Sequence, residues 1–187
     1  EGKVCLDAGI STGGFTDCLL QYGASKIFGI DVGYGQTAWK IRNDPRVILR
    51  ERTNIRNLTP ENFYQLDEEL PSLGVADLSF ISLRIVLPSF TSLLKSGNAE
   101  CLLLIKPQFE VGRERVGKGG VVRDPQSHID AVNSVIEAAV KLKWYPKGLL
   151  PSPITGPAGN HEYLLWLDYQ EVEFVLEVEK IVSRTLA

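Results

Sequence analysis

Up to residue 105, short apolar runs alternate with segments that carry a helical pattern. The runs expected to form strands are Lys3–Leu6, Lys26–Asp31, Val47–Arg50, Val75–Leu78 and Cys101–Ile105. The segments expected to form helices lie near Phe15–Gln21, Thr37–Arg42, Pro60–Leu66 and Ile85–Leu94. Strands that alternate with helices in this way predict a parallel α/β sheet.

The pattern changes after the fifth strand. Pro107–Gln126 is rich in glycine and charge, which predicts a long loop. Ser127 and Asp130 then form the expected capping pair of a helix that runs to Lys143. Apolar residues recur at helical spacing along this segment, so one face of the helix is expected to be buried.

Trp144–Ile154 and Tyr163–Tyr169 are predicted to be two further strands, and a last helix is expected near Val172–Arg184. The Gly- and Pro-rich loop between the two strands leaves no room for a crossover helix, so they are expected to pair antiparallel. Together these elements predict one domain over residues 1–187. Its fold class is α/β: a doubly wound, mostly parallel seven-stranded sheet with an antiparallel last strand, the Rossmann-like arrangement of S-adenosylmethionine-dependent methyltransferases.

The strongest local motif is a glycine-rich turn between the first strand and the first helix. Glycines there let the backbone turn sharply and approach a ligand without a Cβ in the way. Asp31 ends the second strand, where its carboxylate can accept both ribose hydroxyls of a nucleoside. For Asn54, a contact with the adenine edge and a plain turn role both stay open. The residues expected to bind the ligand are Asp7, Gly9, Ser11, Thr12, Gly13, Gly14, Phe15, Asp31 and Asn54.

Two residues of this turn discriminate between candidate ligands. A dinucleotide enzyme has the pattern G-x-G-x-x-G, but this chain has Ser11 at the second glycine position. Asp7 precedes the first glycine, and its carboxylate would repel a pyrophosphate, whereas it suits the cationic amino-acid end of S-adenosylmethionine. The turn therefore favours the methyl donor over a nicotinamide dinucleotide.

Three ionisable residues are expected at the carboxyl edge of the sheet, where doubly wound folds bind their ligands. Asp77 ends the fourth apolar run, Lys106 follows the fifth, and Glu162 starts the last strand. Each residue alone could cap a helix or lie in solvent, but their joint placement favours catalysis. Methyl transfer to a ribose hydroxyl needs a base, and a lysine serves as one when part of it is neutral.

Composition and charge narrow the classes of protein to which the chain can belong. No apolar run approaches the roughly 20 residues that span a bilayer. Cys5, Cys18 and Cys101 are widely spaced in apolar stretches, which indicates structural thiols in a reducing cytoplasm and no metal site. The net charge is −3, yet six basic residues stand against two acidic ones between Trp39 and Arg56. This stretch is either a solvated surface or a phosphate-binding one whose RNA affinity falls with salt.

Five longer segments carry a family resemblance. They are residues 7–17 (DAGISTGGFTD), 76–83 (ADLSFISL), 105–110 (IKPQFE), 119–125 (GGVVRDP) and 159–163 (GNHEY). By these motifs and their order, nearly the whole chain resembles the TlyA, or hemolysin A-type, branch of the FtsJ-like RNA 2′-O-methyltransferases. The resemblance implies a cytoplasmic enzyme that uses S-adenosylmethionine to methylate a ribose, that of cytidine, in ribosomal RNA.

The same resemblance implies a Lys-Asp-Lys-Glu catalytic tetrad, whose last three members match Asp77, Lys106 and Glu162. It also supports the predicted donor contacts, although relatives can carry Asp where Asn54 stands. The first lysine and a small N-terminal RNA-binding domain precede the glycine-rich motif in the family, and this chain lacks them. We therefore expect a piece of a longer protein that binds the donor but methylates poorly or not at all.

Three other classes stay open. A nicotinamide oxidoreductase would bind NAD and not S-adenosylhomocysteine. A catalytically silent RNA-binding module would show no donor binding or turnover even in the complete protein. A membrane-lytic protein, suggested by the hemolysin name alone, would need a spanning or strongly amphipathic basic segment, and the sequence has none.

Overall fold

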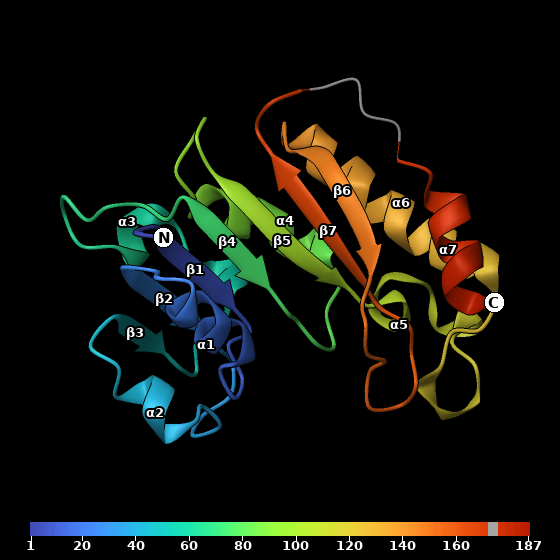
Figure 1. Cartoon of the computed structure of the whole chain (residues 1–187), viewed down its shortest axis with the longest axis horizontal. Helices are drawn as coiled ribbons and strands as arrows, with labels where there is room; N and C mark the ends of the chain where they lie inside the picture. Colours follow the sequence, from blue (N-terminus) through green and yellow to red (C-terminus); the bar gives the residue numbers. More distant parts are fainter. Residues whose placement is uncertain (172–175) are drawn as a thin grey trace. The chain divides into compact units, whose positions relative to one another are not determined.

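A computed structural model describes residues 1–171 and 176–187 as an α/β protein (Figure 1). The strands form a seven-stranded sheet in the order β3-β2-β1-β4-β5-β7-β6. They are β1 (Val4–Ala8), β2 (Lys26–Ile30), β3 (Val47–Arg50), β4 (Leu73–Ala76), β5 (Glu100–Ile105), β6 (Tyr145–Pro151) and β7 (Tyr163–Asp168). The predicted doubly wound, mostly parallel sheet is confirmed.

The helices are mostly short. The α-helices are α1 (Gly14–Gln21), α2 (Trp39–Arg42), α3 (Pro60–Phe63), α4 (Leu83–Ser92), α5 (Pro107–Glu110), α6 (Pro125–Lys141) and α7 (Val178–Leu186). Three 3₁₀ turns are η1 (Ile55–Asn57), η2 (Arg113–Arg115) and η3 (Lys118–Gly120). Among the described residues, no helix is both long and apolar enough to cross a bilayer.

The chain divides into two compact units, of which the first comprises residues 1–77 and 88–101. Here β1 pairs in parallel with β2 and β4, and β2 pairs in parallel with β3. All five residues of β1 are buried, as expected of a strand that has a neighbour on each side. The core beside it contains Cys5, Ala24 and Ile27. Burial raises the pKa of the Cys5 thiol to about 11, which makes it a structural rather than a reactive group.

The second unit comprises residues 78–87 and 102–187. Its β6 and β7 pair antiparallel, from Tyr145 opposite Asp168 to Pro151 opposite Tyr163, which confirms the expected antiparallel finish. Helices α6 and α7 run beside this hairpin (Figure 1). The buried face of α6 includes Ala131, Val132, Val135 and Ala139. The helical spacing of apolar residues predicted this face correctly.

Several element boundaries differ from the sequence expectations. The capping pair predicted at Ser127 and Asp130 is wrong, because α6 begins two residues before Ser127. Asp124 caps it, accepting hydrogen bonds from Ser127 N (3.0 Å) and Oγ (2.7 Å), and Pro125 is the first helical residue. Proline fits there because the first helical position needs no N–H. The predicted loop Pro107–Gln126 contains α5 and two 3₁₀ turns. Of the predicted last helix, residues 172–175 lie outside the described residues.

Candidate functional site

The glycine-rich turn is built as the sequence predicts. After β1, the backbone N–H groups of Gly9 and Ile10 donate to the carbonyl of Ile30, at 2.8 and 3.1 Å, so the turn is fixed to the end of β2. Gly9 and Gly13 adopt positive φ angles of 82° and 100°, which favour glycine. A Cβ at Gly13 would also come within 2.9 Å of the Ile41 side chain. These glycines are therefore required by the turn itself.

Asp31 holds this turn from the neighbouring strand. Its Oδ2 accepts a hydrogen bond from Ser11 N (2.8 Å), and its Oδ1 accepts one from Gly33 N (2.7 Å). Ser11 is held at a φ of 47°, in the left-handed region that a serine seldom adopts. The carboxylate thus lies directly over the turn, which is the position a ribose-binding acid at the end of β2 needs.

Asp7 is the most unusual residue of the turn. Its side chain is only 1% exposed, and its Oδ2 accepts a 2.6 Å hydrogen bond from Thr16 Oγ1. Its Oδ1 is buried and has no hydrogen-bond partner among the described residues. Desolvation raises the pKa of Asp7 to about 6, the Thr16 hydrogen bond opposes this, and the charges of Asp77 and Asp31 add to it. A buried carboxylate oxygen without a partner is suited to a cationic ligand.

Other predicted donor contacts are placed as follows. The carbonyl of Thr12 accepts a hydrogen bond from Ala38 N (3.1 Å), which joins the turn to the segment before α2. Gly14 begins α1, and Phe15 on its first turn is half-buried. Asn54 has a local role, because its Oδ1 accepts from Arg56 N (3.1 Å) and caps η1. Asn54 therefore acts as a turn residue, one of the two roles left open for it. Its contact with adenine stays a prediction.

The three proposed catalytic residues fall in both units. Asp77 belongs to the first, where its backbone N–H donates to the carbonyl of Ala8 (3.0 Å) at the end of β1. Lys106 and Glu162 belong to the second. Lys106 directly precedes α5, and its Nζ donates to Ser79 Oγ at 3.2 Å. The convergence of the three residues stays a prediction.

Glu162 lies in a confined position at the start of β7. It is 6% exposed, and its carbonyl accepts from Ser152 N (2.8 Å). A Cβ at Gly156 would come within 2.7 Å of Glu162 Oε1, so the loop before β7 passes close to this carboxylate only because residue 156 is glycine. The sequence alone did not single out Gly156.

The segment 117–124 is tied down by three buried residues that sequence reasoning missed. Asn160 accepts from Val122 N (3.0 Å) through Oδ1 and donates to the Gly120 carbonyl (2.9 Å) through Nδ2. His128 Nε2 lies 3.0 Å from the Val122 carbonyl, and its Nδ1 lies 3.0 Å from the Tyr163 hydroxyl. Desolvation lowers the pKa of His128, so the neutral ring donates to Val122 and accepts from Tyr163. The GNHEY motif thus supports this loop as well as carrying Glu162.

Half of the basic residues in the stretch 39–56 form ion pairs. Ion pairs neutralise three of its six basic residues: Lys40 with Asp17 (2.8 Å), Arg42 with Glu51 (2.6 Å) and Arg46 with Asp44 (2.7 Å). In the loop after β5, Arg115 pairs with Asp130 at 2.7 Å. The phosphate-binding alternative left open for residues 39–56 can therefore rest on only part of their charge.

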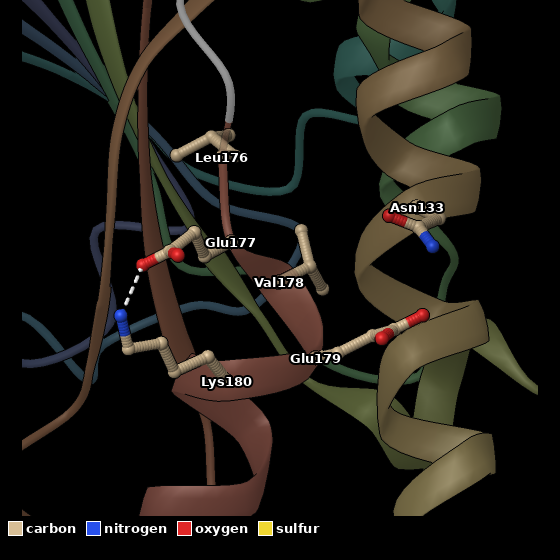
Figure 2. A pocket seen from close by; sticks show the side chains of 6 residues that line it. All are labelled: Asn133, Leu176, Glu177, Val178, Glu179 and Lys180. Carbon is tan, nitrogen blue, oxygen red and sulfur yellow. Dashed lines mark hydrogen bonds and ion pairs between the residues drawn. The ribbon is translucent and has the colours of Figure 1, made fainter.

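A pocket of about 370 Å³ lies between α6 and the start of α7 (Figure 2). It is lined by Asn133, Leu176, Glu177, Val178, Glu179 and Lys180, none of which is a predicted site residue. Glu177 and Lys180 pair with each other at 2.7 Å, as the dashed line in Figure 2 shows. Across residues 1–171 and 176–187, no group of His, Cys, Asp or Glu side chains could hold a metal ion. The candidate site thus remains the glycine-rich turn.

The arrangement of Asp31 predicts a large effect of its removal. Asp31→Ala is expected to weaken binding of S-adenosylmethionine by about 1–3 kcal/mol, because charge-assisted hydrogen bonds to the ligand and the two bonds that hold the turn are lost together. Calorimetric titration measures this loss. Glu100→Ala, at the opposite end of the strands where Glu100 pairs with Lys3, serves as the control and should leave binding unchanged. Unchanged affinity in Asp31→Ala would exclude Asp31 as a donor contact.

Comparison with known proteins agrees with this geometry. The family profile described as FtsJ-like methyltransferase matches residues 1–169. The 16S/23S rRNA (cytidine-2′-O)-methyltransferase TlyA of Mycobacterium tuberculosis is 53% identical over 169 residues, which are 90% of this chain and 61% of that protein. YqxC of Bacillus subtilis, named provisionally as an rRNA methyltransferase, is 50% identical over 90% of this chain and 59% of its own.

Among solved structures, a hemolysin-named protein from Lactococcus lactis superposes with a TM-score of 0.91 at 45% identity, covering 98% of this chain and 88% of that one. The chain spans about three fifths of the length of the TlyA and YqxC relatives it matches. The family profile covers the turn, Asp31, Asp77, Lys106 and Glu162, which are the residues of the candidate site. The chain belongs to the FtsJ-like methyltransferase family.

Proposed function

We propose that this chain is the catalytic part of an S-adenosylmethionine-dependent RNA methyltransferase that acts on the 2′-hydroxyl of cytidine in ribosomal RNA. One observation carries the donor assignment: the buried Asp7 carboxylate has an oxygen without a partner among the described residues, directly behind the glycine-rich turn. A pyrophosphate would place negative charge near that carboxylate, whereas S-adenosylmethionine places positive charge there. The activity for which the TlyA relative is named, at 53% identity, supports the acceptor assignment.

The donor is held by the first unit alone. Asp7 faces the cationic amino-acid end, Asp31 accepts the ribose hydroxyls, and the backbone of Gly9 to Gly14 lies against the ligand. The orphan oxygen of Asp7 and the Asp31 carboxylate over the turn are what a cationic nucleoside needs, so the residues present fit S-adenosylmethionine. When bound, this cofactor would supply a methyl group attached to a positively charged sulfur. After the transfer, the rest of the cofactor would be released as S-adenosylhomocysteine.

The acceptor hydroxyl is handled by Lys106, Asp77 and Glu162. As the 2′-oxygen took the methyl carbon and the bond from that carbon to sulfur broke, the hydroxyl proton would pass to Lys106. Asp77 is the third proposed catalytic residue, and Glu162 holds the hydroxyl or a neighbouring amine. Bringing the hydroxyl into line with the methyl group accounts for much of the remaining acceleration.

We further propose that the complete protein is longer than this chain and works in the cytoplasm. The tetrad's first lysine and an N-terminal RNA-binding domain would precede the glycine-rich turn. The donor site does not depend on these segments, because Asp7, Asp31 and the turn all lie within the 187 residues. Without those segments, RNA binding would be weaker and the hydroxyl would be poorly aligned.

A methylation assay on ribosomal RNA with labelled S-adenosylmethionine tests this function. The complete protein should transfer methyl groups to cytidine ribose, and the 187-residue chain should bind the donor with similar affinity but turn over weakly or not at all. Equal rates for the two would refute the need for a preceding segment. Binding of NAD without binding of S-adenosylhomocysteine would refute the donor assignment.

A further inference from the structure

We propose that Glu110 is a positioning residue that holds Lys106 in a fixed position against the segment 79–83. This inference rests on the proposed function, in which Lys106 takes the proton of the ribose hydroxyl. Glu110 lies four residues after Lys106 and is not a member of the implied tetrad. Its contacts, all within the second unit, carry the inference.

The Glu110 carboxylate is buried, and both of its oxygens accept hydrogen bonds. Its side chain is 1% exposed, and it accepts hydrogen bonds from Ser82 Oγ (2.5 Å) and Leu83 N (2.7 Å). Arg84 Nε lies 3.4 Å from Oε2. Because Leu83 is the first residue of the ten-residue helix α4, the carboxylate caps a helix start, where unpaired N–H groups and the helix dipole favour an anion. Burial raises the pKa of Glu110, and the bonds from Ser82, Leu83 and Arg84 oppose that rise.

Lys106 is connected to Glu110 through a single helical turn. Helix α5 begins directly after Lys106 and ends at Glu110, and Phe109 N donates to the Lys106 carbonyl at 2.9 Å. One end of this turn is fixed to Ser82 by Glu110, and at the other end Lys106 Nζ bonds Ser79 Oγ at 3.2 Å. The two segments are thus joined at matching positions, which defines where the lysine amine lies.

Phe80 shows that the segment between these two ties is under strain. Its φ angle is 65°, in the left-handed region that is unfavourable for a bulky residue. Its side chain is 91% exposed, so burial contributes little to holding it there; its ring meets that of Phe109 at 5.3 Å between centroids. The fixed points at Ser79 and Ser82 must therefore maintain this conformation. Without Glu110 the strain can relax, and Ser79 then moves away from Lys106.

The expected consequence is a loss of alignment rather than of ligand binding. A base that is displaced by about 1 Å from its productive position can lose on the order of a hundredfold in rate. The donor site lies in the other unit and does not involve Glu110. Substitution of Glu110 should therefore lower kcat while leaving the donor Kd unchanged.

Glu110→Ala and Glu110→Gln, made in the complete protein, test this inference. Glu110→Ala should lower kcat by about 10- to 100-fold, with the KM for RNA and the donor Kd within threefold of wild type. Glu110→Gln should recover most of kcat, because its carbonyl can still accept from Leu83 N and its amide can donate to Ser82 Oγ. Glu68→Gln is the matched control: Glu68 is a part-buried carboxylate that pairs with Lys26, at the amino end of β2, and its loss should leave kcat unchanged.

A crystal structure of the Glu110→Ala chain gives a readout that does not need activity. It should show Phe80 outside the left-handed region and the Lys106–Ser79 hydrogen bond broken. Retention of both features, or an unchanged kcat in Glu110→Ala well below its melting temperature, would overturn the inference. If the wild-type protein does not methylate RNA, the proposed function fails, and the crystal structure alone still decides the role of Glu110.

Discussion

Replacing Lys106 by methionine should lower the methyl-transfer rate of the complete protein by about 10²- to 10⁴-fold, the usual contribution of a positioned acid or base. Methionine keeps the length and apolar stem of the side chain but removes the amine that donates to Ser79 Oγ. The ribose hydroxyl would then have no group to take its proton as the bond to the methyl carbon forms. Donor affinity should stay within twofold of wild type, because the donor residues lie in the first unit.

Single-turnover kinetics with saturating donor and RNA measure this effect on the chemical step. Lys141→Met is the matched control, since Lys141 is an exposed lysine in the last turn of α6. It should keep the wild-type rate. A Lys106→Met protein with an undiminished rate would remove Lys106 from the mechanism, and the proton would have to pass to another group.

The residues of the donor turn could be predicted because they follow one another in sequence. A buried strand, a glycine cluster and a helix start determine where Gly9, Gly13 and Asp31 lie, since each is at most a few residues from an element boundary. The positive φ angles of Gly9 and Gly13 confirm the reason for glycine there. The apolar spacing of α6 and the Gly- and Pro-rich loop between β6 and β7 are also local features. The buried helix face and the antiparallel pair that they predict are both confirmed.

The residues that sequence reasoning missed act across long separations. Thr16 bonds Asp7, nine residues away, because α1 turns that hydroxyl back toward β1. Glu110 bonds Ser82, 28 residues away, and Asn160 bonds Val122, 38 residues away. No periodicity connects such pairs, because their distance is set by tertiary packing. Their presence inside the DAGISTGGFTD, ADLSFISL, IKPQFE, GGVVRDP and GNHEY motifs is the available signal.

One sequence prediction, the capping pair of α6, is wrong because a local competitor was overlooked. Ser127 was expected to cap the helix after the loop, but Asp124 followed by Pro125 is the stronger start. Between residues 39 and 56, the sequence count of six basic against two acidic residues does not include Asp17, which lies outside the stretch and pairs with Lys40. A charge count along the sequence therefore overstates the electrostatic field that RNA would meet.

Asp7 should make the protein less stable than it could be, and its titration gives the sign. The pKa of Asp7 rises from 3.8 to about 6 on folding, so the folded state favours the protonated carboxyl. The resulting stabilisation is complete below about pH 4 and is lost as the pH rises through 6. At pH 8, the ionised carboxylate opposes folding by about 3 kcal/mol, since each tenfold change in a protonation equilibrium is worth roughly 1.4 kcal/mol. Desolvation is the main cause, and a bound cation would offset it.

Asp7→Asn should therefore raise stability at pH 8 and abolish donor binding together. The amide still accepts from Thr16, but its NH₂ group has no partner either, so the expected net gain is about 1–3 kcal/mol, or a melting temperature higher by roughly 2–10 °C. Thermal unfolding with and without S-adenosylmethionine measures both effects: the donor should stabilise the wild type and not the variant. Thr16→Val keeps the Asp7 carboxylate but removes the hydrogen bond that lowers its pKa. As the pH is lowered, donor affinity should therefore begin to fall at a higher pH in this variant than in the wild type. A buried carboxylate that serves a cationic ligand must lower stability when that ligand is absent. If Asp7→Asn instead melted at a lower temperature and were still stabilised by the donor, Asp7 would only support the turn.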